Sequence, residues 1–267
     1  MTKLSQAPEM QWNQWLAGVI DGDGYLAIQK NGVAVCEITM GLKDEYLLAQ
    51  IKQKLGGHLK LRSGAQAIRY RLSHKAGLQD LILRINGFIR NSIRVKQFKL
   101  ICQHFGIEFQ EAAPLIRQSS YTAGFFDADG TIWITVTRIP KEFATQKGLL
   151  GKINRLRYSR AANQLCISIS NKYLENLIPF YTAFQIGKIR KVVQKSKTWH
   201  VWDIKKDYEI LYFTDYLRTA QARSAKVKRV YLIERYFQLK RLNAHLAPEE
   251  TSLSQAWFQF CQKWYLG

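Results

Sequence analysis

The sequence has little that would tie it to zinc, to disulfide bonds or to a membrane. Its four cysteines are widely scattered, without a Cys-x-x-Cys pair or a Cys/His cluster at the spacing of zinc ligands. It has no uncharged apolar run of about eighteen residues, and its first residues lack the basic segment and apolar core of a signal peptide. We therefore expect a soluble protein of a reducing compartment, with no membrane partner.

Acidic residues are scarce as well. The chain has 40 Lys and Arg against 20 Asp and Glu, a formal net charge of +20. Such a charge destabilises a compact chain by self-repulsion unless the usual partner is a polyanion, so nucleic acid is the first candidate. On charge alone, a merely basic protein of a ribosome or of a membrane surface stays an alternative. With 267 residues, 47% of them hydrophobic, one large domain or two small ones are possible.

An internal repeat organises the chain. Residues 15–28 read WLAGVIDGDGYLAI and residues 121–134 read YTAGFFDADGTIWI, which share an aromatic residue, Ala-Gly and Asp-x-Asp-Gly at the same positions. A second pair of similar basic segments follows, RVKQFKL at 94–100 and KVKRVYL at 226–232. The first pair is separated by 106 positions and the second by 132, so the second half carries roughly 26 more residues, most of which we assign to a basic loop at 138–160.

Hydrophobic periodicity predicts a similar order of elements in both halves: helix, two strands, helix, two strands, helices. In the first half we expect strands at 25–30, 34–40, 58–62 and 67–72, and helices at 44–55, 76–87 and 92–105. In the second half we expect strands at 131–138, 164–170, 187–193 and 199–204, and helices from about 207 and 221. The predicted organisation is a first half at 1–107, a linker at 108–120, a second half at 121–243 and a helical tail at 244–267.

Two helices, at 11–22 and 118–128, are expected to end at the repeated Asp-x-Asp-Gly, with Gly24 and Gly130 in the left-handed conformation after each helix. Small residues at helical spacing would let the two helices pack closely; they are Ala17, Gly18, Gly22, Ala123, Gly124 and Ala128. Asp23 and Asp129 would then meet where helix dipoles disfavour carboxylates, so a hard divalent ion, Mg²⁺, is expected between them. One Asp-Gly copy alone would indicate only a helix-stop turn.

Both segments resemble the LAGLIDADG motif, as LAGVIDGDG at 16–24 and TAGFFDADG at 122–130. Over roughly residues 10–242 the chain resembles a monomeric LAGLIDADG homing endonuclease. The resemblance implies an α+β fold of two pseudo-symmetric αββαββα halves, with the motif helices packed at the interface and two antiparallel DNA-binding sheets. It also implies sequence-specific, metal-dependent double-strand cleavage for intron or intein homing, across the minor groove of a long non-palindromic site, leaving short 3′ overhangs.

The resemblance also assigns roles to residues. It makes Asp23 and Asp129 the catalytic acids and metal ligands, gives the backbone carbonyls of Gly22 and Ala128 a share in the metal site, and leaves Asp21 and Asp127 structural. Basic residues in the matching regions are Arg94, Lys96, Lys226 and Lys228. An arginine at 94 departs from the usual lysine, and arginine hardly deprotonates. The implied chemistry is metal-assisted phosphodiester hydrolysis with Mg²⁺, for which Mn²⁺ or Ca²⁺ would substitute in binding.

Alternate polar side chains of the strands are expected to face the DNA and read bases. They are Gln29, Glu37, Lys60, Arg62, Arg69 and Arg71 in the first half, and Thr135, Thr137, Ser168, Lys188, Arg190 and His200 in the second. A register slip of one residue would exchange the faces. The 138–160 loop would either clamp phosphates or form a solvated insertion; its basic residues include Lys141, Lys147, Lys152, Arg155, Arg157 and Arg160.

Double-stranded DNA, bound by a monomer, is therefore the expected partner. An intron maturase that binds RNA with the same fold is the main alternative, so intron RNA stays a possible partner. A DNA-binding regulator is a weaker alternative, because a regulator needs no paired carboxylates. We expect a chloroplast or mitochondrial location if an organelle encodes the chain, and the cytoplasm otherwise.

Overall fold

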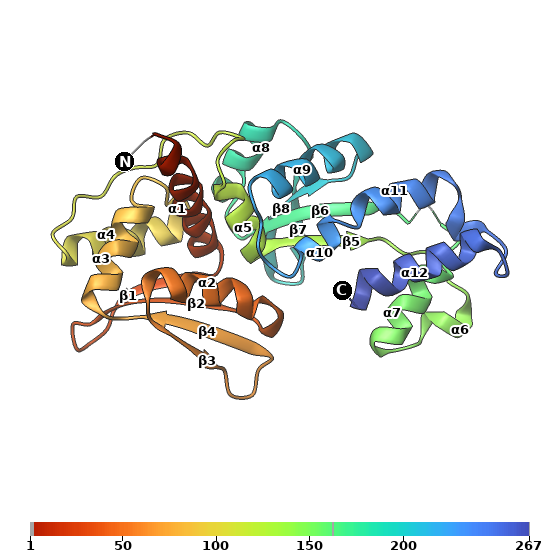
Figure 1. The fold of residues 1–267 in the computed structure, drawn as a ribbon, viewed down its shortest axis with the longest axis horizontal. Coiled ribbons are helices and arrows are strands. Elements are labelled where there is room, and N and C mark those ends of the chain that lie inside the picture. Colours follow the sequence, from red (N-terminus) through yellow and green to blue (C-terminus); the bar gives the residue numbers. More distant parts are fainter. Residues whose placement is uncertain (1–2, 162, 267) are drawn as a thin grey trace. The chain divides into compact units, whose positions relative to one another are not determined.

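The computed structural model describes residues 3–161 and 163–266. It contains two four-stranded sheets with helices on one side of the strands (Figure 1). No helix in the described part of the chain is long and apolar enough to cross a membrane. The α+β class predicted from the sequence is confirmed.

The first half follows the predicted order of elements. It contains α1 (Lys3–Asp23), β1 (Gly24–Ile28), β2 (Ala34–Gly41), α2 (Glu45–Leu55), β3 (His58–Leu61), β4 (Ala67–Leu72), α3 (Lys75–Ile85) and α4 (Ser92–His104). Its antiparallel strands lie in the order β1-β2-β4-β3. Helices α2 and α3 pack on β2, and α4 packs on β1. One face of this sheet is thereby covered, and the other is left open.

The second half repeats this order with additions. It contains α5 (Tyr121–Asp129), β5 (Gly130–Ile134), α6 (Lys141–Ala144), α7 (Gly148–Arg157), β6 (Leu165–Asn171), α8 (Ile178–Phe184), β7 (Lys188–Gln194), β8 (Lys197–Ile204), α9 (Asp207–Thr219), α10 (Val227–Val230), α11 (Ile233–Arg241) and α12 (Ser252–Leu266). Its strand order, β5-β6-β8-β7, is the equivalent of the first sheet's order. The duplication seen in the sequence is therefore a duplication of topology.

The chain also divides into two compact units, and this division differs from the two repeated halves. The first unit contains Met1–Gly130, Ile169–Trp202 and Tyr216–Ala225; the second contains Thr131–Ser168, Asp203–Asp215 and Lys226–Gly267. Both motif helices, α1 and α5, belong to the first unit. The carboxylates at their ends therefore lie within one compact body.

The prediction of a basic loop at 138–160 is wrong, because most of this segment is helical. Helix α7 buries Gly151, Ile153 and Leu156 and packs against α12. The Arg157 guanidinium lies 4.1 Å from the centre of the Phe258 ring, and Trp257 Nε1 donates to the Arg157 carbonyl at 3.3 Å. Apolar residues at helical spacing, with α12 to cover them, outweigh the high charge of this segment.

Three other boundaries differ from the prediction by at least four residues. Helix α1 begins at Lys3 rather than at residue 11. Strand β5 ends at Ile134 rather than at 138, and the helix expected from 221 begins only at Val227, as α10. The predicted terminal helix is present as α12.

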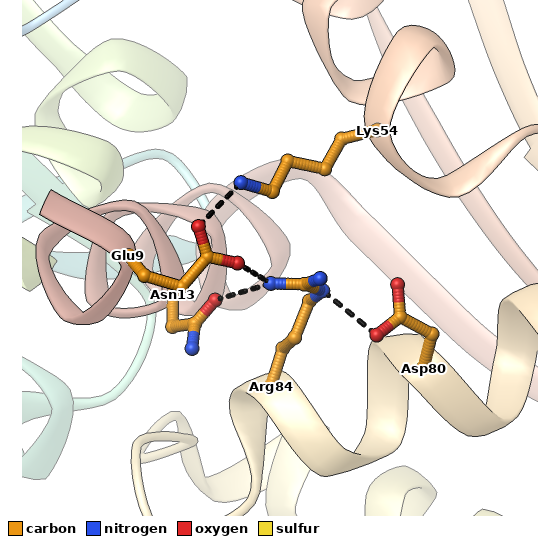
Figure 2. A network of polar contacts seen from close by, with 5 residues as sticks. All are labelled: Glu9, Asn13, Lys54, Asp80 and Arg84. Carbon is orange, nitrogen blue, oxygen red and sulfur yellow. Dashed lines mark hydrogen bonds and ion pairs between the residues drawn. The ribbon is translucent and has the colours of Figure 1, made fainter. Parts of the chain in front are cut away.

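A polar network fixes the first turns of α1 (Figure 2). Glu9 accepts a hydrogen bond from Lys54 of α2 at 2.5 Å and another from Arg84 of α3. Arg84 also pairs with Asp80 at 2.9 Å and donates to Asn13 at 3.2 Å. The hydrogen bond from Lys54, followed by that from Arg84, holds the pKa of Glu9 below its usual value. The partly exposed network contributes little stability, but it sets the position of α1 on α2 and α3.

Candidate active site

The motif helices α1 and α5 approach each other at backbone distance. A Cβ at Gly18 would stand 2.1 Å from the carbonyl oxygen of Tyr121, and a Cβ at Gly124 would stand 1.9 Å from that of Trp15. Trp15 and Tyr121 are equivalent positions of the repeat, as are Gly18 and Gly124. The contacts are therefore reciprocal, as a pseudo-two-fold axis between the helices requires. The close packing predicted from the small residues is confirmed.

The end of the helix pair is equally close. A Cβ at Gly22 would stand 2.3 Å from the Cβ of Ala128 and 3.6 Å from Oδ2 of Asp129. Gly22 and Ala128 are again equivalent positions, so each lies near the pseudo-axis. The carboxylate of Asp129 therefore lies beside the residue that precedes Asp23.

Gly24 and Gly130 do not adopt the left-handed conformation that the sequence predicts. Gly130 has φ −72° and ψ 153°, which is extended backbone, and Gly24 is the first residue of β1 and is not among the glycines of positive φ. A Cβ at Gly24 would stand 2.5 Å from the carbonyl oxygen of Ile20, and one at Gly130 would stand 2.1 Å from the ring of Phe126. Close contact, and not a left-handed turn, requires glycine here.

The inner aspartates, Asp21 and Asp127, bind the opposite motif helix. The hydroxyl of Tyr121 donates to Oδ2 of Asp21 at 2.5 Å, and Trp15 Nε1 donates to Oδ2 of Asp127 at 2.9 Å. Both carboxylates are fully buried. Each aspartate thus joins its own helix to the first aromatic residue of the other motif.

Backbone amides complete the surroundings of these two carboxylates. Asp21 accepts from the amides of Arg90 and Asn91 at 2.6 and 3.0 Å. Asp127 accepts from the amides of Arg223 and Ser224 at 2.7 and 2.9 Å. The inner aspartates therefore also anchor the segment that leads into each half's basic region.

Burial decides the protonation of the inner aspartates. It raises the pKa of Asp21 to about 6, although the hydrogen bonds from Tyr121, Arg90 and Asn91 oppose the shift. It also raises the pKa of Asp127. Their burial and their hydrogen bonds to the opposite helix and to backbone amides fit the structural role expected for them, although Oδ1 of Asp21 has no hydrogen-bond partner among the described residues.

Arg94 is the basic residue that the structure brings to the helix pair. Its Nε donates to the carbonyl of Ile20 at 3.3 Å, and its Nη1 donates to Oε1 of Gln97 at 3.2 Å. Burial lowers the pKa of Arg94, while Asp21, Asp129 and Asp23 in that order raise it. The guanidinium therefore lies in the field of both outer aspartates.

Lys96 points elsewhere. It is exposed, and residues two apart on a helix do not share a face. Since Arg94 uses the face of α4 that meets α1, the geometry favours Arg94 over Lys96 as the first-half basic residue.

The donor atoms at the helix ends suit a hard divalent cation. Across residues 3–161 and 163–266, no three His, Cys, Asp or Glu side chains gather as a metal-binding group. The available ligands are the carboxylates of Asp23 and Asp129 with the carbonyls of Gly22 and Ala128, which are all oxygen atoms, and Mg²⁺ accepts few protein oxygens because it keeps several waters. The missing side chain at Gly22 leaves room beside Asp129. The residues present therefore fit Mg²⁺.

Strand register gathers most of the predicted base-reading residues of the first half on the open face of its sheet. Glu37 of β2 pairs with Tyr25 of β1 and with Arg71 of β4, which pairs with His58 of β3. One row further, Thr39 pairs with Arg69, which pairs with Lys60. The alternate residues of β2 and β4 are buried. Residues on this face that sequence reasoning missed are Tyr25, Thr39 and His58.

The open face carries a basic hollow, and one acidic residue lies beside it. Glu37 pairs with Arg71 at 2.7 Å and with Arg69 at 3.4 Å. A hollow of about 630 Å³ lies beside them. It is lined by His58, Lys60, Leu61, Arg62, Ser63, Arg69 and Arg71. Gln29 and Arg62 are exposed just beyond the ends of β1 and β3.

Known proteins are similar to this chain in sequence and in architecture. The model of the LAGLIDADG endonuclease family matches residues 16–105. The intron-encoded DNA endonuclease ai2b of Dictyostelium discoideum is 30% identical over 253 residues, which are 94% of this chain and 88% of that protein. The chain belongs to the LAGLIDADG endonuclease family.

Other relatives of this LAGLIDADG chain are longer. The intron-encoded RNA maturase bI4 of Saccharomyces cerevisiae is 41% identical over 257 residues, 96% of this chain. The chain spans only 37% of that maturase and 38% of a second relative. Among solved structures, I-SmaMI bound to an uncleaved DNA target in the presence of calcium ions has a TM-score of 0.63 and 14% identity, with 92% of this chain and 97% of that one covered. This likeness confirms the LAGLIDADG fold.

In the second sheet, two predicted base-reading residues need correction. Ser168 of β6 is only 5% exposed, so it offers almost no surface to a base. His200 alternates with Trp202 and Ile204, which are fully buried, and its Nδ1 lies 3.4 Å from the carbonyl oxygen of Lys172. The assumed register of β8 was therefore one residue out, and Trp199 takes the opposite face.

The other predicted residues of the second sheet are accessible. Lys188 and Arg190 are exposed on β7. Thr135 and Thr137 are exposed beyond the end of β5. These four stay predictions, because exposure alone does not identify a base contact.

Lys226 and Lys228 stand in the second compact unit, the former at the N-cap of α10 and the latter inside it. Counted from the amides that bind the inner aspartates, the two halves are out of step. Arg94 follows Arg90 by four residues, whereas Lys226 follows Arg223 by three. Aligning the halves by their basic segments makes Lys226 the equivalent of Arg94, whereas aligning them by the amides that bind the inner aspartates shifts the match by one position. The role of Lys226 therefore stays a prediction.

Proposed function

We propose that this LAGLIDADG chain is a sequence-specific, divalent-metal-dependent endonuclease of double-stranded DNA that acts as a monomer in intron or intein homing. The observation that carries the proposal is the approach of the two motif ends, where Gly22 and Ala128 meet and Asp129 lies beside Gly22. Two equivalent carboxylates at one point would repel each other without a cation. The endonuclease names of relatives such as that of Dictyostelium support the same reading.

Asp23 and Asp129, with the carbonyls of Gly22 and Ala128, would hold Mg²⁺. When bound, the cation makes a water molecule a better nucleophile and offsets charge on the phosphate. The buried inner aspartates keep the two helix ends in register. Arg94 stabilises negative charge that develops on the phosphate, and as a permanent cation it does not accept a proton.

The open sheet faces would bind the major groove, with Arg69, Arg71 and Lys60 among the groups that reach bases or phosphates. The net charge of +20 supports association with DNA. Each outer aspartate would serve one strand. Cleavage across the minor groove then leaves short 3′ overhangs.

The experiment is cleavage of a randomised DNA library with Mg²⁺, followed by sequencing of the cut ends. We expect one long non-palindromic motif with 3′ overhangs of constant length. Ends without a common motif, or products that form equally well in EDTA, would overturn the proposal. Runs with Mn²⁺ and Ca²⁺ would separate support of catalysis from support of binding.

A second candidate is an intron maturase, because a relative with 41% identity bears that name. The two functions are separable by competition. A maturase would bind its intron RNA in the presence of excess DNA target and raise the splicing rate of that RNA. An endonuclease without this activity would release RNA to the DNA competitor.

A further inference from the structure

Two short turns of the repeat reach across to the opposite half. Turn η1 (Leu42–Asp44) follows β2, and turn η2 (Leu174–Asn176) follows β6, so they are equivalent elements. Oδ1 of Asp44 accepts a hydrogen bond from the amide of Ala225 at 2.7 Å. Oδ1 of Asn176 accepts one from the amide of Ser92 at 2.9 Å. All four residues belong to the first compact unit.

These bonds form at the start of the two basic segments. Ser92 is the first residue of α4 and precedes Arg94 by two positions. Ala225 directly precedes Lys226. In each case the acceptor comes from one half of the repeat, and the basic segment comes from the other.

Four successive amides at the start of α4, those of residues 90–93, each have a side-chain acceptor. The amides of Arg90 and Asn91 bind Asp21, that of Ser92 binds Asn176, and that of Ile93 binds the side chain of Asn91 at 3.0 Å. The first amides of a helix have no acceptor within the helix. Asn176 therefore completes a continuous set of bonds that fixes the backbone from which Arg94 projects.

Asn176 is itself held in place. Its Nδ2 donates to Oδ1 of Asn171 at 3.0 Å, and it is 7% exposed. Asn171 also accepts from the amide of Tyr173 at 3.0 Å. This chain of bonds determines which amide atom of Asn176 faces Ser92, so its acceptor is in position before any DNA is bound.

We propose that Asp44 and Asn176 are positioning residues, each of which fixes the backbone of the basic segment in the other half. Cleavage of each DNA strand then depends on a residue from the half that does not carry that strand's basic segment. The proposal rests on the proposed endonuclease function. It goes beyond that function in coupling the two strand cleavages through two side chains that touch neither metal nor DNA.

The test uses the full chain and a target duplex with a different label on each strand. Asn176→Ala and Asp44→Ala should each slow single-turnover cleavage of one strand by about ten- to a hundredfold, on opposite strands, because small misplacements of a positioned group are costly. Asn176→Asp and Asp44→Asn keep an acceptor and should restore most of the rate. Glu175→Ala and Lys43→Ala change exposed neighbours in the same turns and should leave both strands unaffected.

Amide hydrogen exchange of the free protein gives a readout that does not depend on cleavage. Asn176→Ala should speed exchange at the start of α4, and Asp44→Ala should speed it around Ala225. Equal slowing of both strands without rescue, or unchanged exchange, would overturn the proposal. A further outcome is that the wild-type chain cuts no DNA although each variant speeds amide exchange in the opposite half as expected. The endonuclease function and the catalytic part of this proposal would then both be wrong, and the bonds would be purely structural.

Discussion

Gly18 of α1 lies so close to Tyr121 of α5 that a Cβ on Gly18 would stand 2.1 Å from the carbonyl oxygen of Tyr121. The obstacle is backbone, which cannot move aside as a flexible side chain would. Any side chain at Gly18 therefore pushes the two helices apart. Since the same helices end at Asp23 and Asp129, their separation would also change the site.

Gly18→Ala should lower the free energy of unfolding by about 3 kcal/mol, the upper end of the usual cost of overpacking, because backbone must shift. Urea denaturation followed by circular dichroism measures it. Gly41→Ala is the matched control, since Gly41 has φ −64° and the nearest atom to its Cβ is 4.0 Å away. Equal stability of the two variants would contradict the contact between the helices.

Much of the fold could be predicted from the sequence, because the repeat and local periodicity carry it. Strand β4 was predicted with its observed bounds, and most other elements within a few residues. Helix α7 was missed because the apolar spacing of Ile153 and Leu156 was given less weight than the charge around them. Those side chains are buried only because they pack against α12, which lies about a hundred residues later in the sequence.

Asp21 should make stability depend on pH. Its ordinary pKa is 3.8, and burial raises it to about 6 in the folded protein. The folded state therefore binds the proton more tightly than the unfolded state, so protonation of Asp21 stabilises the fold. This stabilisation is complete below pH 4 and is lost as the pH rises through about 6. Relative to Asp21→Asn, the wild type should lose roughly 2 to 3 kcal/mol between these limits. Urea titrations of both proteins at several pH values measure the difference, and a difference that does not vary with pH would count against the raised pKa.

Glu37 should limit binding to arbitrary DNA, because it pairs with Arg69 and Arg71 on the open sheet face. Glu37→Gln releases both arginines to phosphates. We expect tighter nonspecific binding, a salt dependence steeper by about one phosphate contact, and a smaller preference for the target. Anisotropy titrations over a range of salt concentrations measure all three. Glu45→Gln, an exposed change of equal charge on α2, is the control, and identical behaviour would reduce the effect to net charge.

Arg94 should act on the chemical step. Arg94→Met is expected to lower the single-turnover rate by about ten- to a thousandfold, or about 1.4 to 4 kcal/mol, with a much smaller change in the dissociation constant. Arg94→Lys should retain cleavage. If Lys96→Met slowed the reaction more than Arg94→Met did, the assignment of the first-half basic residue would be reversed. Weaker binding with an unchanged rate at saturation would make Arg94 a phosphate anchor.

The candidate site was only partly predictable. The small residues between the helices could be predicted, since they follow from composition at helical spacing, and the close packing at Gly18 and Gly124 confirms them. The repeated motif also predicts Asp23 and Asp129 as the outer carboxylates, and their role stays a prediction. The surroundings of the inner aspartates could not be predicted, because their amide partners lie 69 to 97 positions away along the chain. The face of β8 failed for a related reason: a one-residue difference in register exchanges the two faces, as His200 demonstrates. Ser168 of β6 alternates with the fully buried Ile167 and Ile169 as predicted, but tertiary packing leaves it only 5% exposed.

The most direct measurement of the central claim is cleavage of a supercoiled plasmid carrying the target by Asp23→Asn, Asp129→Asn and the double variant, with Mg²⁺. Asparagine keeps the size of the side chain but removes the charge that, in the proposed function, would hold the cation. We predict that each single variant binds the target and yields at most nicked plasmid, with the nick on opposite strands, and that the double variant leaves the plasmid intact. Linear product from either single variant at the wild-type rate would contradict the assignment of these carboxylates.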